Sequence, residues 1–245
     1  ISNTTETNLI IGQGCKVTLT NSHLHNTQSN GIYTIGPNTI EISNCIITDS
    51  QYPLIYVNKS KITIKNSTFK NCEQNGLSIN TSPQVQIENN TFENIKSSAI
   101  SISTDSTGIV NGNSFTKIGG NSIYTKLSEI EIYDNKISDQ TYPGIAITYS
   151  STSKIYHNEI KDIKYNGIAI RNAKYAKIFE NEIDSIGECA VSVSNTEKVE
   201  VENNKISNCD ITSVESYNHS NTFVKNNIIS KIGKHAFLCY TSGFM

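Results

Sequence analysis

The ten residues QIENNTFENI, at positions 86–95, decide the fold because the chain repeats this phrase along almost its whole length. An apolar pair at i and i+2 is followed by an Asn-rich polar turn and then by another apolar residue. A fixed period of this size is the signature of a repeat architecture. The apolar residue after the turn marks each return of the phrase, and its positions are Leu24, Ile47, Phe69, Phe92, Phe115, Ile137, Ile160, Ile183, Ile206 and Ile229.

Each period contains three short segments in which apolar and polar residues alternate, which is the two-residue period of a β-strand. The first strand is exemplified by residues 77–79, the second by residues 85–87, and the third begins at the apolar marker. A small residue often precedes the first strand, as Gly76 does, because a tight corner leaves little room. The pattern predicts an all-β coil of about ten turns, each of 22–23 residues, whose stacked strands form three parallel sheets around an apolar interior.

The period is unbroken from Leu9 to Cys239, so we expect one solenoid domain at residues 9–245 after a polar lead-in at residues 1–8. Coils of this kind normally need caps over their terminal turns. Neither end of the sequence shows a cap. We therefore expect adjoining domains, or a partner or oligomer contact, to cover the ends.

One asparagine per period lies between the second and third strands without a gap. Asparagine carries both a donor and an acceptor, so such a column can bond amide to amide along the coil and satisfy buried turn backbone. Towards the N-terminus the column continues as Ser22, Cys45 and Ser67. We interpret the column as structural, and its members are Asn90, Asn113, Asn135, Asn158, Asn181, Asn204 and Asn227.

The six cysteines do not predict a disulfide framework or a zinc site. Cys72, Cys209 and Cys239 occupy repeat positions held elsewhere by aliphatic residues, and we expect them to be buried. The other three, Cys15, Cys45 and Cys189, fall in turns. No two cysteines occupy matching positions in adjacent turns, and no CxxC or Cys/His cluster is present.

The composition argues against nucleic-acid binding and against membrane insertion. The formal net charge is −2, and Arg171 is the only arginine, so no basic surface for a phosphate backbone is expected. No apolar run is long enough to span a bilayer.

With these repeats, the chain resembles the right-handed parallel β-helix superfamily of pectin-lyase-like enzymes, alginate epimerases and NosD-like proteins. The resemblance covers residues 9–239 and implies a single right-handed parallel β-helix, secreted or at the cell surface. It does not select one activity, because the superfamily includes lyases, hydrolases, epimerases, tailspikes and adhesins.

In the lyases of this superfamily, the reacting groups project from the outer face of the first strand. Among the outward positions expected here are Tyr33, Ile55 and Val57 towards the N-terminus, followed by a serine-rich stretch. Abstraction of a proton beside a uronate carboxylate needs a cation for that carboxylate and a base such as Lys, Arg or Tyr. Our candidate catalytic residues are Lys126, Arg171 and Tyr217, and our candidate substrate-binding residues are Tyr124, Tyr149, Tyr165, Glu188 and Glu215.

Lys126 and Arg171 are expected at matching positions two turns apart, about 10 Å between Cα atoms, which would bracket one sugar ring. The alternative interpretation is a solvated sheet face with scattered charges. The superfamily's paired aspartates, Asp-Pro-His motif and calcium-binding carboxylate cluster are all missing. We therefore expect no cofactor and no metal site; calcium stays open as an alternative, although no cluster of ligands for it is identified. The short turns also argue against an efficient catalyst, because long insertions usually wall the groove.

A second outward column, Tyr133, Tyr156 and Phe179, is expected on the second strand. It predicts either a glycan- or protein-binding ladder or simple lateral stacking between strands. The leading function is recognition or processing of an extracellular acidic polysaccharide, with lyase-like or epimerase-like chemistry. The alternative is a non-catalytic structural, adhesin or phage-tail module that binds a protein or glycan.

Overall fold

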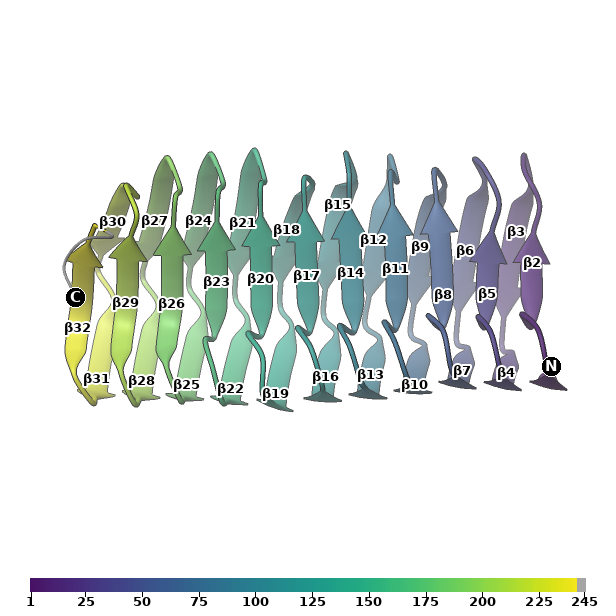
Figure 1. Ribbon diagram of the computed structural model, residues 1–245, viewed down its shortest axis with the longest axis horizontal. Helices are drawn as coiled ribbons and strands as arrows, with labels where there is room; N and C mark the ends of the chain where they lie inside the picture. Colours follow the sequence, from purple (N-terminus) through teal and green to yellow (C-terminus); the bar gives the residue numbers. More distant parts are fainter. Residues whose placement is uncertain (242–245) are drawn as a thin grey trace.

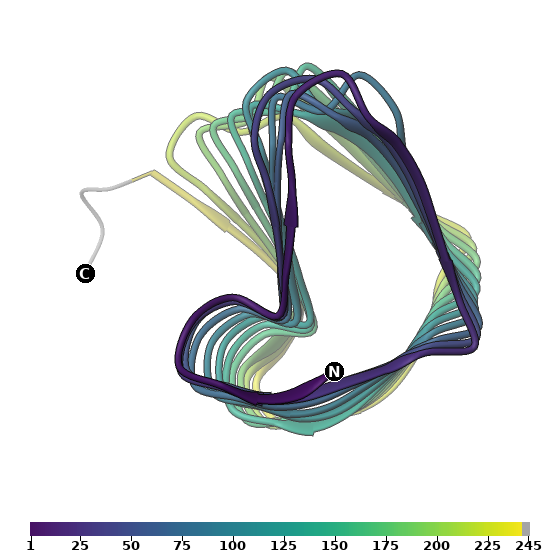
Figure 2. The same cartoon turned by 90° about the vertical axis from the view of Figure 1, so that its right-hand side faces the viewer.

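The computed structural model describes residues 1–241 and winds them into a β-solenoid of stacked turns, with the two ends of the chain at opposite ends of the long axis (Figure 1). Each turn contributes one strand to each of three parallel sheets, and residues 1–241 contain no helix. Viewed along the axis, the turns superpose around a common interior (Figure 2). The all-β solenoid with three parallel sheets that the period predicts is confirmed.

The first sheet has 11 strands and carries the face on which the candidate site lies. Its strands are β2 (Leu9–Ile11), β5 (Ile32–Thr34), β8 (Ile55–Asn58), β11 (Leu77–Asn80), β14 (Ile100–Ser103), β17 (Ile123–Lys126), β20 (Ile145–Thr148), β23 (Ile168–Arg171), β26 (Cys189–Ser194), β29 (Thr212–Tyr217) and β32 (His235–Tyr240).

The second sheet has 10 strands. They are β3 (Lys16–Thr20), β6 (Thr39–Ser43), β9 (Lys61–Lys65), β12 (Val85–Glu88), β15 (Thr107–Asn111), β18 (Glu129–Tyr133), β21 (Thr152–Tyr156), β24 (Tyr175–Phe179), β27 (Lys198–Glu202) and β30 (Thr222–Lys225).

The third sheet has 11 strands. They are β1 (Ser2–Thr4), β4 (His23–Thr27), β7 (Ile46–Ser50), β10 (Thr68–Cys72), β13 (Thr91–Ile95), β16 (Ser114–Ile118), β19 (Lys136–Gln140), β22 (Glu159–Ile163), β25 (Glu182–Ile186), β28 (Lys205–Cys209) and β31 (Ile228–Ile232).

Parallel pairing places each residue beside its equivalent in the next turn, so like side chains stack on like. Ile145 of β20 pairs with Ile168 of β23, and both are fully buried. In the third sheet, Phe69, Phe92 and Phe115 stack in the interior with ring centroids 4.9 and 5.1 Å apart. Burial of each such side chain contributes about 1.5–3 kcal/mol. The solenoid is therefore held together by continuous apolar columns.

The predicted asparagine column forms a hydrogen-bonded ladder. The side-chain Nδ2 of Asn135 donates to Asn158 Oδ1 at 3.0 Å and to the backbone oxygen of Val110 at 2.9 Å. Asn135 Oδ1 in turn accepts from the backbone N and the Nδ2 of Asn113. Towards the N-terminus, Ser67 Oγ accepts from the backbone N of Cys45 at 3.1 Å, so the hydroxyl column continues the same role. Each asparagine thus satisfies turn backbone that is buried between the sheets.

The expected register of β8, the third strand of the first sheet, is wrong by one residue. Ile55 and Val57 point inward and are fully buried, whereas Tyr56 lies outside and stacks on Tyr33. Leu54 is also buried, because it occupies the corner that Gly76 occupies in the next turn. The run from Leu54 to Val57 is apolar at every position, so alternation alone cannot select its inward residues.

Strand β1, within residues 1–8, pairs Ser2 with His25 and begins the third sheet. Two cysteines differ from the sequence-based expectation. Cys189 lies within β26 and is buried, whereas Cys239 is exposed because no strand of residues 1–241 stacks beyond β32. Cys72 is buried opposite Ile95, as expected, and all six thiols are free.

Candidate functional site

The outer face of the first sheet carries two parallel columns of side chains. The first, which we call the middle column, runs through Tyr124, Ala146, Ala169, Ser192 and Glu215. The second, which we call the edge column, lies two residues further along each strand and runs through Lys126, Thr148, Arg171, Ser194 and Tyr217. Lys126 and Arg171 therefore share a column with one turn between them, as expected.

A groove of about 420 Å³ opens over the middle column where β17, β20 and β23 lie side by side. Its floor is Ala146 and Ala169, whose small side chains leave a depression beyond the larger Tyr124. Arg171 lies on the edge-column side. On the opposite side, the groove is lined by Tyr142 and other residues of the connections from the third to the first sheet. We call this feature the central groove.

The opposite wall exists because these connections bulge outward as a rounded lobe beside the first sheet (Figure 2). The lobe re-enters the sheet through tight corners such as Gly167, where an added Cβ would lie 2.7 Å from the backbone oxygen of Ala190. A side chain at Gly167 would therefore force the neighbouring backbone to shift. The corner leaves Tyr142 and Tyr165 on the lobe, 51% and 39% exposed, with ring centroids 5.7 Å apart. The wall of the groove is thus aromatic and open to solvent.

Two charges face the groove without an ion-pair partner. Within residues 1–241, no carboxylate lies within salt-bridge distance of Arg171, and no cation does so for Glu188. The Tyr124 and Thr148 hydroxyls lie 3.2 Å apart, which fixes the Tyr124 ring beside the floor. The groove therefore offers a free guanidinium, a free carboxylate and aromatic surface. A guanidinium binds a carboxylate through two parallel hydrogen bonds.

The structure brings together four of the eight candidate site residues. Tyr124, Tyr165, Arg171 and Glu188 line the central groove. Sequence reasoning did not assign a role to the alanine floor, although Ala146 and Ala169 can be read from the sequence as two successive alanines at outward strand positions. The amides Asn121 and Asn166 were missed as wall residues, because their placement depends on the shape of the lobe.

Lys126 and Tyr149 lie outside the central groove. The Lys126 ammonium is 6.0 Å from the Tyr149 ring centroid, within reach of a cation–π contact. Tyr149 lines a separate hollow of about 310 Å³ with Asp105, Leu127 and Glu129, at the connection from the first to the second sheet. Lys126 and Tyr149 thus form a small cluster where the first sheet leads into the second sheet.

Tyr217 and Glu215 lie further towards the C-terminus. Tyr217 stacks on Tyr240 at 5.5 Å, and the Tyr240 hydroxyl donates to Glu215 Oε1 at 3.3 Å. Burial, followed by the nearby Glu215 charge, raises the pKa of the Cys189 thiol to about 12. Four turns separate Lys126 from Tyr217, about 19 Å along the axis. These two residues therefore do not reach the same sugar ring.

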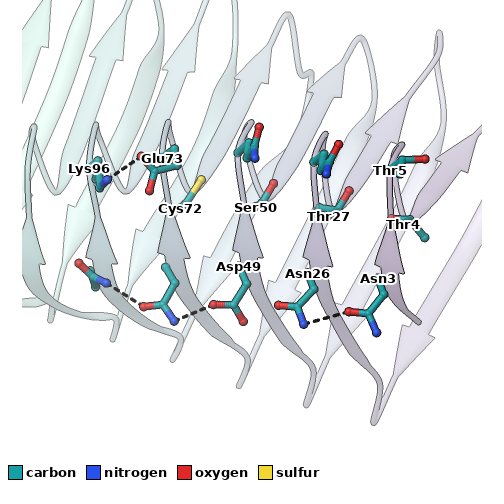
Figure 3. A pocket seen from close by; sticks show the side chains of 14 residues that line it. Asn3, Thr4, Thr5, Asn26, Thr27, Asp49, Ser50, Cys72, Glu73 and Lys96 are labelled. Carbon is teal, nitrogen blue, oxygen red and sulfur yellow. Dashed lines mark hydrogen bonds and ion pairs between the residues drawn. The ribbon is translucent and has the colours of Figure 1, made fainter.

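A polar trough of about 560 Å³ follows the N-terminal half of the third sheet (Figure 3). Its lower edge is a column of amides and one carboxylate in which Asn71 Nδ2 donates to Asp49 Oδ1 at 2.9 Å. Along its upper edge, Lys96 pairs with Glu73 at 2.6 Å (Figure 3). These groups mostly bind one another and hold adjacent turns in register. Within residues 1–241, no group of three His, Cys, Asp or Glu side chains is placed to hold a metal ion.

The outward aromatic column of the second sheet is present and its neighbours are charge-paired. Tyr133, Tyr156 and Phe179 stack at 4.9 and 4.8 Å. Beside them, Lys154 pairs with Glu131 at 2.7 Å. This arrangement fits lateral stabilisation of the strands.

Comparisons with known proteins agree with the fold. The family model described as a right-handed beta helix region matches residues 1–136 and 117–245. The A-module of the Azotobacter vinelandii mannuronan C-5 epimerase AlgE4 superposes with a TM-score of 0.66 at 12% identity, covering 92% of this chain and 77% of the module. A mutant of the periplasmic alginate epimerase AlgG superposes with a TM-score of 0.73 at 10% identity, covering 92% and 72%.

The A-module of the Azotobacter vinelandii epimerase AlgE6 gives a TM-score of 0.62 at 15% identity, covering 96% of this chain and 79% of the module. A search of curated protein sequences finds no match. Within residues 1–241, no helix has the length and apolar character needed to cross a membrane.

Proposed function

Because the chain belongs to the right-handed β-helix family, we propose that it recognises an acidic polysaccharide outside the cytoplasm, in the central groove of its first sheet. The observation that carries this proposal is the unpaired Arg171 guanidinium beside an alanine floor and a tyrosine wall. Arg171 binds the carboxylate of a uronate residue, the rings of Tyr142 and Tyr165 contact sugar faces, and Glu188 accepts hydrogen bonds from sugar hydroxyls.

The substrate class follows from the chemistry of the groove. A neutral glycan offers a free guanidinium only hydroxyl and ring oxygens, whereas a polyuronate presents one carboxylate per sugar, which a guanidinium binds through two charge-assisted hydrogen bonds. The structural neighbours named as alginate epimerases and mannuronan epimerases act on polyuronates, which supports the same class here. Polymannuronate and polyguluronate are therefore the first ligands to test, and polygalacturonate is the third.

Lyase-like or epimerase-like processing extends this proposal. Both reactions begin with removal of the proton beside the uronate carboxylate, and both need that carboxylate neutralised. Arg171 supplies the neutralising charge, and Tyr124 is the candidate base, because it lines the groove and its hydroxyl lies beside that of Thr148. Lys126 and Tyr217 act instead on neighbouring parts of a longer chain.

A non-catalytic module is the second candidate function, and the short connections around the groove favour it. The connections beside the groove comprise only residues 141–144, 164–167 and 187–188, so no loop closes over a bound sugar. An open groove binds without excluding water, and exclusion of water is what such chemistry requires. On this account, the protein binds the same polymer and leaves it unchanged.

Calorimetric titration with the three polyuronates and a neutral glucan tests the proposal. We expect binding of at least one polyuronate and none of the glucan, with binding by Arg171→Gln reduced about tenfold or more. Lys177→Gln is the matched control, because Lys177 is on the second sheet. Equal binding of the glucan, or full affinity in Arg171→Gln, would refute recognition at this groove.

The same samples distinguish the two candidate functions. Absorbance of the unsaturated product reports a lyase, and proton NMR of the recovered polymer reports epimerisation. A change in either readout that Tyr124→Phe abolishes assigns catalysis to the groove. Binding with no change in the polymer assigns the non-catalytic role.

A further inference from the structure

The tyrosine pair, Tyr33 and Tyr56, stands on the outer face of the first sheet well before the central groove. The two rings stack with centroids 5.0 Å apart and an interplanar angle of 11°. Tyr33 is 36% exposed, and the neighbouring Ile10 and Ile35 are more exposed still. The solenoid therefore presents aromatic surface to solvent at a second place on the same face.

The stack has one open end. The centroid spacing nearly equals the spacing of adjacent strands, so the ring planes lie across the axis and Tyr56 turns its second face towards the next turn. The residue at that position is Ser78, followed by Ser101 in the turn after it. Neither serine is large enough to cover a phenol ring. Tyr56 is half-buried, and no side chain of the middle column stacks on its C-terminal face, which leaves that face for a ligand.

A strip of hydroxyl and amide groups connects the tyrosine pair to the central groove. It consists of Ser78, Asn80, Ser101 and Ser103, all half-buried, and we call it the hydroxyl strip. Ser103 Oγ donates to Asn80 Oδ1, and Asn75 Nδ2 donates to Ser78 Oγ at 3.0 Å. The strip contains no charged side chain. Its groups are suited to hydrogen bonds with the hydroxyls of a sugar, and none of them carries a positive charge that would pair with a carboxylate.

The tyrosine pair, the hydroxyl strip and the central groove lie on one line. Tyr56, Ser78, Ser101, Tyr124, Ala146 and Ala169 occupy successive turns of the middle column. Five turns separate Tyr56 from Ala169, about 24 Å along the axis. A linear polymer held in the groove and extended towards the N-terminus passes over the strip and reaches Tyr56.

We propose that the tyrosine pair and the hydroxyl strip form a second binding site for the same polysaccharide, one that contacts sugar rings and hydroxyls without reading charge. This inference rests on the proposed function of the central groove. It assigns charge recognition to Arg171 and length recognition to Tyr56. The protein therefore selects long polysaccharide chains, and it tolerates neutral or modified sugars in the part of the bound segment that lies towards the N-terminus of the protein.

A length series of oligouronates tests the inference. Short oligomers that fill only the central groove should bind the wild-type protein and Tyr56→Ser equally well. Oligomers long enough to span the distance from Ala169 to Tyr56 should bind the wild-type protein about two- to tenfold more tightly than short ones, because a sugar ring packed on one aromatic face adds one favourable contact. In Tyr56→Ser this gain should disappear.

Serine is chosen because the next two turns carry serine in the same column, so the substitution suits the strand. Tyr133→Ser, which removes an equally stacked tyrosine from the second sheet, is the control and should keep the gain with length. Circular dichroism confirms that each variant is folded.

The outcomes separate the two proposals. Binding of short oligomers with no gain for long ones, or a full gain in Tyr56→Ser, overturns the second site and leaves the central groove intact. Failure of every oligomer to bind overturns the groove itself, and the second site with it.

Discussion

Replacement of Asn135 by alanine should destabilise the solenoid by about 3–5 kcal/mol. The Asn135 side chain is fully buried in the middle of the ladder. Its loss removes the donor to the backbone oxygen of Val110 at 2.9 Å and to Asn158 Oδ1 at 3.0 Å. It also removes the acceptor for the backbone N of Asn113 at 3.0 Å and for its Nδ2 at 3.1 Å. Each buried group left without a partner costs about 1–3 kcal/mol, and water replaces only part of the loss.

The matched control is Asn227→Ala, at the same repeat position in the last turn of the column. Asn227 accepts from the backbone N of Asn204 at 2.8 Å but is only half-buried, so water reaches the groups left behind. Its replacement should cost about 1 kcal/mol. Asn135→Ser should fall between the two alanine variants, because a serine hydroxyl fills this position at Ser67 and accepts from backbone there.

Urea unfolding followed by far-ultraviolet circular dichroism measures the three variants against the wild-type protein. The predicted order of destabilisation is Asn135→Ala, then Asn135→Ser, then Asn227→Ala. A cost below about 1 kcal/mol for Asn135→Ala, or one equal to that of Asn227→Ala, would refute the account of the ladder as buried backbone satisfaction.

Three further predictions concern thiols, acid stability and backbone. In the native protein at pH 8, Ellman's reagent should modify the exposed Cys15 and Cys239 quickly. Cys189 should react slowly, because burial and Glu215 raise the pKa of its thiol to about 12. Rapid loss of all six thiols would contradict this burial pattern. Hydrogen bonds from Ser207 and two other side chains lower the pKa of Asp184 below its usual value, despite partial burial. The stability that Asp184 contributes is therefore present above the unfolded-state pKa near 3.8 and is lost as the pH falls through the lower folded-state pKa. Asp184→Asn should flatten this part of the acid-unfolding curve, and an unchanged slope would contradict the prediction. Gly108→Ala should lower the melting temperature strongly, because the φ of Gly108 is +149° and an added Cβ would lie 1.9 Å from the Val85 backbone oxygen. Gly12→Ala should leave the melting temperature nearly unchanged, because a Cβ there meets no atom within 4 Å. Equal melting temperatures for the two variants would contradict this geometry.

The sequence predicted the columns of the solenoid well because stacking transmits one repeat position to the next. Once the period places Asn135 and Asn158 at equivalent positions, parallel pairing makes them neighbours. The same pairing stacks Phe69, Phe92 and Phe115, which the period places at equivalent positions, in the interior. It failed at residues 54–57, where the apolar run has no alternation to read, and at Cys239, whose burial would have needed a further turn.

The candidate site was only half predictable, because its walls are not set by the repeat. The edge column placed Arg171 on the outer face directly from its strand position. By contrast, Asn121 and Asn166 reach the groove through the shape of the lobe, which depends on corners such as Gly167. Strand position likewise could not show that Lys126 lies beside Tyr149, away from the groove. The repeat period determines which residues share a column, whereas the connections between strands determine the shape of the clefts.

Hydroxyl-radical footprinting in the presence of the bound polyuronate tests the central claim most directly, because it reports where the polymer lies. Tyr142 and Tyr165 are 51% and 39% exposed, so both are oxidised readily in the free protein. The account predicts that the polymer protects these two tyrosines and leaves Tyr133 and Tyr156 of the second sheet as reactive as before. Protection of Tyr133 and Tyr156, with Tyr142 and Tyr165 still oxidised at their free rate, would contradict recognition in the central groove.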